Sequence, residues 1–274
     1  MPKIIEAANF RINRLSERML RPWMVRLGWQ PSGVSPVSEL QIDSCFGYDE
    51  EAAIKRAASM VMNHTMVSFH RLASLWAQVR YLDRYSLAGS MVECGVWKGG
   101  AAGLMALAHL HDRSRADRDL HLFDSWEGLP EPRAERDGQR ALDYASGHAS
   151  GALKPIGQCV SSMQEVSDLL ESKIGYPRDL LHYHKGWFQE TLAAGGASLG
   201  EISLLRLDGD WYDSTKICLE ELYPRVTKHG VVVIDDYGHW AGCRTAVDEF
   251  IATLAAPIIL HRVDYSCRYW IKPD

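Results

Sequence analysis

Four carboxylates stand at the ends of two short apolar segments in the second half of the sequence. The segment ISLLRL is followed by Asp208, Gly209 and Asp210, and the segment GVVVI by Asp235 and Asp236. Short apolar runs that end in turn residues predict buried strands. If the strands are neighbours, four carboxylates at their tips would raise one another's pKa values. Solvated turn carboxylates are the ordinary alternative, but Mg²⁺, which prefers oxygen ligands, would resolve the repulsion, and we predict it here.

A glycine-containing turn follows the first predicted strand, SMVEC. It reads Glu93, Cys94, Gly95 and then, after three residues, Gly99, before a helical segment. Glycine lets the backbone turn tightly, and a helix N-terminus offers free N–H groups to an anion. The spacing is not GxGxxG, which weakens a dinucleotide interpretation. It is nearer to the ExGxxxG loop of methyltransferases, where the anion is a carboxylate, although a purely structural glycine is also compatible with it.

The second and third predicted strands end in residues suited to a nucleoside. Asp124 and Ser125 follow the second strand, where an acid can accept both ribose hydroxyls. After the third strand, Gly186 would let the backbone pass beside an adenine and Trp187 could cover it. Ser162 opens the preceding helix and could bond adenine nitrogens. A turn cap, core packing and a helix N-cap are the structural alternatives for the acid, the Trp and the Ser.

The elements that must position these residues alternate between strand and helix from residue 90 onward. This order predicts an α/β fold, in which a mostly parallel sheet is covered by helices on both faces and closed by two antiparallel C-terminal strands. Residues 126–160 are polar, with Gly and Pro, and are expected to form a long loop. Segments 50–63 and 66–87 have helical spacing. We therefore divide the chain into an N-terminal helical arm and lid, 1–87, and a catalytic domain, 88–274.

The composition limits the possible classes of function. The 274 residues carry a net charge of −5, and 46% are hydrophobic, which is ordinary for a globular protein and argues against disorder and against nucleic-acid binding by bulk charge. No apolar run is long enough for a transmembrane helix. The six cysteines match no metal or disulfide pattern and indicate reduced thiols in a cytoplasmic protein. The apolar spacing in 10–29 and 66–87 suggests a homodimer or higher homo-oligomer, with a membrane-surface helix as the alternative for 10–29.

From about Thr65 to the C-terminus, the chain resembles the metal-dependent class I S-adenosylmethionine O-methyltransferases of the macrocin and noviose type. The motifs that carry the resemblance are ECGVWKGG, FDSWEGLP, KGWF, RLDGDWYDST and IDDYG. It implies a Rossmann-like sheet of seven strands and transfer of a methyl group from S-adenosylmethionine to a hydroxyl, often on a sugar of an antibiotic glycoside. The acceptor would then be a small molecule, either a glycoside or, as the alternative, a catechol-like phenol that chelates the same ion.

The resemblance also assigns roles to individual residues. The Mg²⁺ ligands would be Asp208, Asp235 and Asp236, and Asp210 would be the general base. His239, which lies just past the second acidic tip and titrates near neutrality, is the alternative base. Combined with the strand-end residues above, the predicted cofactor-binding positions are Thr65, Met66, Glu93, Gly95, Asp124, Ser125, Ser162, Gly186, Trp187 and Asp208.

Other classes of protein explain fewer of these residues. A nicotinamide oxidoreductase would leave the four carboxylates without a role and lacks the expected glycine pattern. A metal hydrolase would leave the nucleoside site without a role. A non-enzymatic binding protein has no reason to retain all four carboxylates.

Overall fold

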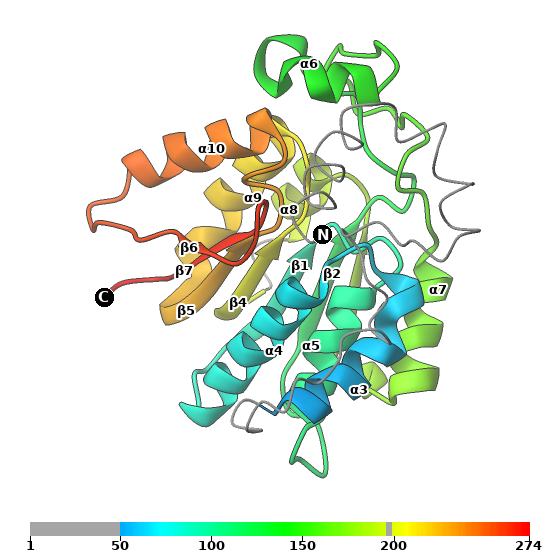
Figure 1. The fold of residues 1–274 in the computed structure, drawn as a ribbon, viewed down its shortest axis with the longest axis vertical. Coiled ribbons are helices and arrows are strands. Elements are labelled where there is room, and N and C mark those ends of the chain that lie inside the picture. Colours follow the sequence, from blue (N-terminus) through cyan, green and yellow to red (C-terminus); the bar gives the residue numbers. More distant parts are fainter. Residues whose placement is uncertain (1–49, 196–198) are drawn as a thin grey trace, which may run out of the picture. The chain divides into compact units, whose positions relative to one another are not determined.

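A computed structural model describes residues 50–195 and 199–274. Its centre is a seven-stranded sheet in the order β3-β2-β1-β4-β5-β7-β6 (Figure 1). Strands β1 to β5 run parallel, and β7 and β6 close the sheet antiparallel, which confirms the predicted topology. The strands are β1 Ser90–Cys94, β2 Leu120–Asp124, β3 Leu181–Lys185, β4 Ile202–Leu207, β5 Val226–Ile234, β6 His261–Arg262 and β7 Arg268–Ile271.

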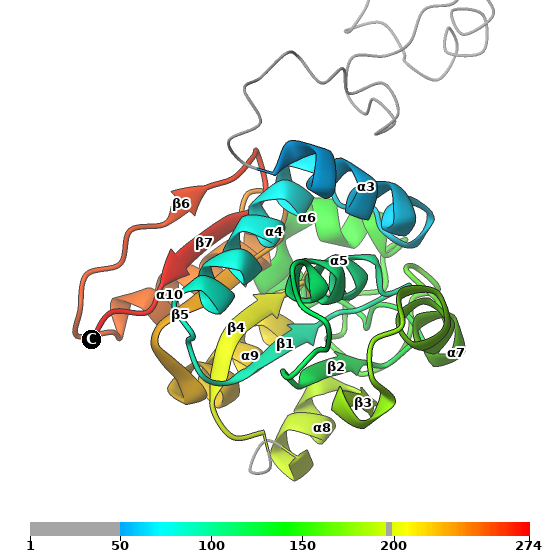
Figure 2. The ribbon, with the colours of Figure 1, turned by 90° about the horizontal axis from the view of Figure 1, so that it is seen from below.

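Helices cover both faces of this sheet. Figure 2 shows α4 and α5 on one side of the central strands and α8 and α9 on the other. The described helices are α3 Glu51–Val61, α4 Phe69–Arg84, α5 Gly100–Leu110, α6 Ala134–Tyr144, α7 Met163–Ser167, α8 Phe188–Gly195, α9 Tyr212–Leu222 and α10 Ala241–Ala252. Short 3₁₀ turns occupy Met62–His64, Arg178–Leu180 and Tyr223–Arg225.

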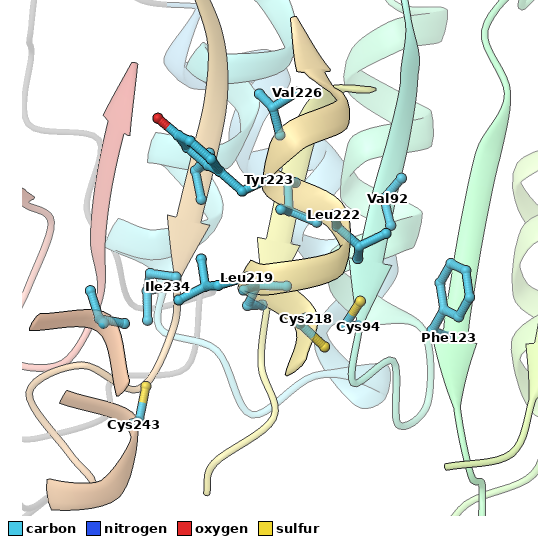
Figure 3. Packing of buried hydrophobic residues seen from close by; sticks show 14 of the residues in the cluster. Val92, Cys94, Phe123, Cys218, Leu219, Leu222, Tyr223, Val226, Ile234 and Cys243 are labelled. Atoms are coloured by element: carbon cyan, nitrogen blue, oxygen red, sulfur yellow. The ribbon is translucent and has the colours of Figure 1, made fainter. Parts of the chain in front are cut away.

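The central strands read as continuous apolar runs because both of their faces are buried. Every residue of β1 and β4 is buried, including the charged Glu93 and Arg206. On one face, Leu219 and Leu222 of α9 belong to the same buried cluster as Val92 of β1 (Figure 3). This packing fixes the strands, and therefore the residues at their carboxyl ends.

The segment 126–160, predicted as a long loop, contains a helix, so that prediction was wrong. Helix α6 occupies its middle, and two isolated bridges, Pro130 with Pro155 and Arg133 with Ser150, fold the remainder back on itself. Gly138 has φ 77° and interrupts α6. The break divides the apolar spacing into pieces too short to indicate a helix from sequence.

The helices predicted for 50–63 and 66–87 are α3 and α4, and most of their apolar residues are buried against the rest of the fold. The predicted arm at 10–29 lies outside the described residues, and the domain division at residue 87 stays a prediction. Within the described ranges, no helix combines the length and the apolar character needed to cross a bilayer.

Candidate active site

A cavity of about 310 Å³ opens beyond the carboxyl ends of the parallel strands. Of the positions predicted from sequence, it is lined by Thr65, Met66, Glu93, Gly95, Asp124, Ser125, Gly186, Trp187, Asp208, Asp210, Asp235, Asp236 and His239. In a parallel α/β sheet, this edge is where ligands bind. The topology therefore brings these residues, which are spread over 175 positions of sequence (from 65 to 239), around one cavity.

The turn after β1 contains a glycine that another residue could replace only if the backbone moved. Gly95 has φ 88°, and a Cβ added there would lie 1.8 Å from the backbone oxygen of Asp208. The turn after β1 and the tip of β4 are consequently in backbone contact. The side chain of Asp124 accepts hydrogen bonds from the amides of Val96 (2.7 Å), Trp97 (2.8 Å) and Trp126 (2.6 Å). Burial raises its pKa despite these bonds.

Residues before α4 reach the same turn because α5 begins with a glycine. A Cβ on Gly100 would lie 2.5 Å from the backbone oxygen of His64 and 2.5 Å from the Cβ of Thr65. This close approach places Thr65 on the cavity wall, and Met66 beside it is 68% exposed at the rim. Trp97 takes a left-handed conformation, φ 49°, in the turn itself. Such backbone strain in a non-glycine residue is typical of functional loops.

Ser162 is the predicted site residue that does not line the cavity. Its hydroxyl accepts a hydrogen bond from the amide of Glu165, which completes a capping box at the start of α7. The neighbouring Ser161 donates to the backbone oxygen of Trp97 at 2.7 Å. The contacts of Ser162 are therefore those of a helix cap, which was the structural alternative for this residue. Ser161 instead stabilises the turn after β1 through its bond to Trp97.

On the opposite side of the cavity, three carboxylates crowd together. Asp208, Asp210 and Asp236 each offer an oxygen, and these atoms lie within 4.8 Å of one another. Burial, with the charge of Asp208, raises the pKa of Asp210 to about 8, and burial with the charges of Asp210 and Asp208 raises that of Asp236. The Oδ2 atom of Asp236 is buried and has no hydrogen-bond partner among the described residues. An unsatisfied buried carboxylate oxygen fits a cation ligand.

Asp235 belongs to the same edge but is held by two arginines. Its Oδ1 accepts from Arg206 at 2.7 Å, and its Oδ2 accepts from Arg71 of α4. Arg206 is buried and also pairs with Glu93 at 2.6 Å and Asp208 at 2.9 Å. Burial raises the pKa of Glu93 to about 8, and the opposing effect of the Arg206 charge, which lowers this pKa, is smaller.

Sequence reasoning missed both arginines, although Arg206 carried a signal. A charged residue inside the apolar run ISLLRL of a buried strand must have a partner, and this one has three. Arg71 gave no comparable signal, because it is one of several basic residues on a helix and its partner is 164 positions away.

The two candidate bases differ in their contacts. The Oδ1 of Asp210 accepts from the indole N–H of Trp240 at 2.7 Å, and Asp210 has the left-handed φ of 57°. His239 Nδ1 lies 3.0 Å from the hydroxyl of Tyr265, and burial lowers its pKa. Both residues line the cavity, and so does Trp240.

Residues 43–272 match the model of the macrocin O-methyltransferase (TylF) family. The chain belongs to the TylF family. Its relatives include the demethyldecarbamoylnovobiocin O-methyltransferase of Streptomyces niveus, 32% identical over 214 residues, 76% of this chain and 75% of that protein. The mycinamicin III 3''-O-methyltransferase of Micromonospora griseorubida is 30% identical and aligns with 76% of this chain and 78% of its own length.

Solved structures agree with this TylF assignment. The O-methyltransferase NovP matches with a TM-score of 0.63 at 30% identity, covering 77% of this chain and 83% of NovP. The calicheamicin methyltransferase CalS11 has a TM-score of 0.57 at 19% identity over 90% of this chain and all of its own, which supports the fold alone. The predicted Rossmann-like class I methyltransferase sheet is confirmed, and the protein is an S-adenosylmethionine-dependent O-methyltransferase.

Proposed function

We propose that this enzyme methylates a hydroxyl on a sugar of a glycosylated natural product and that it depends on Mg²⁺. The observation that carries the proposal is that the carboxylate cluster lies in the same cavity as the turns after β1 and β2. The relatives' names favour a sugar over a catechol-like phenol. One relative from Streptomyces olivaceus, 32% identical, is named for 4'-O-methylation of a rhamnosyl-tetracenomycin.

The donor set suits a hard divalent cation. We assign Asp208, Asp235 and Asp236 as the ligands of Mg²⁺, since oxygen donors at a partly enclosed site are what this ion selects. The arginines on Asp235 do not exclude it, because each carboxylate oxygen has two lone pairs. When bound, the cation supplies electrostatic stabilisation of the negative charge that develops on the acceptor oxygen. Asp210 lies within the same cluster, so a ligand role for it is the competing assignment.

The side chains of this protein would perform the remaining tasks. Trp240 holds one oxygen of Asp210, which leaves Oδ2 to accept the proton of the attacking hydroxyl. The buried Arg206 fixes Glu93 and Asp235 between the two sides of the cavity. Trp187 on the cavity wall helps to exclude water around the methyl donor.

The metal requirement is tested by dialysing the enzyme against EDTA and assaying methyl transfer from S-adenosylmethionine to a panel of glycosides and to catechol. We expect activity to disappear and to return with Mg²⁺. Full activity in a preparation verified as metal-free by elemental analysis contradicts the Mg²⁺ assignment. Methylation of catechol but of no glycoside contradicts the acceptor class and leaves the metal assignment standing.

The general base is tested by comparing Asp210→Asn with His239→Ala. If Asp210 is the base, Asp210→Asn lowers kcat by about 100-fold or more and leaves Mn²⁺ affinity, measured by calorimetry, within threefold of wild type. A large loss of Mn²⁺ affinity instead makes Asp210 a ligand. Loss of kcat in His239→Ala alone transfers the base role to His239.

The N-terminal part of the chain has a proposed role as well. We propose that residues 1–87 form a lid on the acceptor side and contribute to a homodimer or higher homo-oligomer. Thr65 and Met66 belong to this part of the chain and line the cavity, which supports the lid role. Light scattering of the full chain tests the oligomer, and a monomeric mass contradicts it.

A further inference from the structure

One buried carboxylate outside the cavity joins three segments, namely α6 and the starts of α9 and α10. These segments form the wall of the cavity that we propose to face the acceptor, here called the acceptor side. Asp137, in α6, is 2% exposed. Its Oδ1 accepts from the amide of Tyr212 at 2.7 Å, and its Oδ2 accepts from the amide of Arg133 at 2.6 Å. Tyr212 is the first residue of α9, and Arg133 immediately precedes α6.

Both helices depend on Asp137 because neither has a cap of its own. The residues at the two N-cap positions, Arg133 for α6 and Trp211 for α9, make no side-chain capping hydrogen bond. The first amides of a helix have no partner within the helix. A single carboxylate therefore caps two helices that are 75 residues apart at the point of contact.

Glycines make room for this contact. A Cβ on Gly242 of α10 would lie 1.8 Å from Asp137 Oδ1 and 2.9 Å from the amide nitrogen of Tyr212. Gly138 takes φ 77° directly after Asp137 and bends α6 at this point. Helix α10 therefore meets α6 and α9 at the same buried carboxylate, and Figure 1 shows α6 beside α10.

The three joined segments carry the aromatic wall of the cavity. Tyr144 ends α6, Trp240 precedes α10, and Trp211 precedes α9. Trp240 lies 4.9 Å from Trp211 and 5.5 Å from Tyr144, measured between ring centroids. Trp240 also holds Asp210. Tyr144 and Trp240 line the cavity, so their relative position sets the space left for an acceptor ring.

The ion pairs between these segments lie at the surface. Arg133 pairs with Asp213 at 2.7 Å, and Arg136 pairs with Glu249 at 3.2 Å, but all four side chains are more than a third exposed. Exposed ion pairs stabilise a structure little. The buried hydrogen bonds of Asp137 are the stronger constraint, because leaving either amide without a partner carries a desolvation cost.

We infer that Asp137 is a positioning residue for methyl transfer, which holds Tyr144 and Trp240 in register with Asp210 on the acceptor side of the cavity. The inference rests on the proposed function, since it takes this wall to contact the acceptor ring. It does not involve the turns after β1 and β2, because within the described ranges the side-chain hydrogen bonds of Asp137 go to Arg133 and Tyr212.

The test compares Asp137→Asn and Gly242→Ala with the control Asp143→Asn, an exposed carboxyl on the same helix. Asparagine keeps the size of the side chain but offers one accepting oxygen in place of two. The Gly242→Ala variant retains the Asp137 carboxyl group, but the new methyl group would displace it from its position. We expect both variants to lower kcat/KM for the acceptor at least tenfold and to leave the Kd for S-adenosylmethionine, from calorimetry, within twofold. We expect the control to match wild type.

Hydrogen exchange over residues 134–144 provides a readout that needs no acceptor. We expect at least tenfold faster exchange in both variants than in the control. Unchanged exchange, unchanged acceptor kinetics, or an equal loss of cofactor affinity each overturns the inference. If wild type methylates neither glycosides nor phenols, the proposed function fails, and the exchange experiment alone then decides whether Asp137 anchors this wall.

Discussion

The two sides of the cavity satisfy their polar groups in different ways. On the side formed by the tips of β1 and β2, here called the cofactor side, the side chain of Asp124 accepts three backbone hydrogen bonds, and Gly95 leaves no unused space. On the side formed by the tips of β4 and β5, here called the carboxylate side, Asp208, Asp210 and Asp236 repel one another, and one oxygen of Asp236 lacks a partner among the described residues.

This difference indicates which side is complete without a ligand. We expect the cofactor side to be rigid because its hydrogen bonds and its close backbone contacts exist before a ligand binds. Little of the binding free energy of a nucleoside is then lost in ordering this side. The carboxylate side stores unfavourable charge that a cation would relieve. Changes on the first side should therefore affect cofactor affinity and folding, and changes on the second should affect methyl transfer.

The largest expected effect comes from Gly95→Ala. The new Cβ would meet the backbone of Asp208, and a φ of 88° is strained for alanine. We expect calorimetry to show a loss of S-adenosylmethionine affinity of at least about 100-fold, because the turn must move away from β4. Gly175→Ala is the matched control, since Gly175 also has a positive φ, 78°, but has open space around its Cβ position. Equal binding by the two variants contradicts the rigid cofactor side.

Asp236→Asn tests the carboxylate side. It removes one charge from the cluster, so we expect kcat to fall about 100- to 1,000-fold through loss of electrostatic stabilisation. The Kd for S-adenosylmethionine should stay within threefold, and the melting temperature in EDTA should rise because like charges no longer repel. Asp179→Asn, at an exposed carboxyl remote from the strand tips, serves as the control. If Asp236→Asn instead has a lower melting temperature in EDTA than the wild type, the carboxylates of the cluster do not repel one another.

The sequence allowed much of this comparison to be predicted, because strand tips can be located from local patterns. Apolar runs placed Asp208 and Asp236 at one sheet edge, and the position of Asp124 after the second predicted strand indicated a contact with the cofactor. The directions of the hydrogen bonds could not be predicted. They depend on contacts between distant segments, as the ion pair between Arg71 and Asp235 across 164 positions shows. Helix α6 escaped prediction because Gly138 breaks its period.

Asp124→Asn has a moderate expected effect. Oδ2 of Asp124 accepts from the amides of Val96 and Trp97, and Oδ1 accepts from the amide of Trp126. Asparagine keeps only one accepting oxygen, so at least one amide in the turns after β1 and β2 loses its partner. We expect about a tenfold loss in S-adenosylmethionine affinity, the scale of one charge-assisted hydrogen bond. The value of kcat at saturating cofactor should change less than threefold. A kcat loss as large as that of Asp236→Asn shows that the two sides do not divide the work as described.

The smallest expected effect concerns histidines on β2 and on the neighbouring strand β3. His121 of β2 stacks on His182 of β3 at 4.3 Å, and its Nδ1 lies 3.1 Å from Nε2 of His184. Burial and the two neighbouring histidines lower the pKa of His121 to about 4, while Asp119, which pairs with His182, opposes this shift.

The sign of the pH dependence follows from that lowered pKa. The unfolded chain binds a proton at His121 near the ordinary histidine pKa of about 6.5, and the folded chain does so only near 4. The free energy of unfolding should therefore decline as the pH falls from about 6.5 towards 4. In His121→Phe, which keeps a ring for stacking, urea unfolding should show a shallower decline. His261→Phe, at an exposed histidine stacked on Tyr269, should follow wild type. Parallel curves for wild type and His121→Phe contradict a buried, neutral His121.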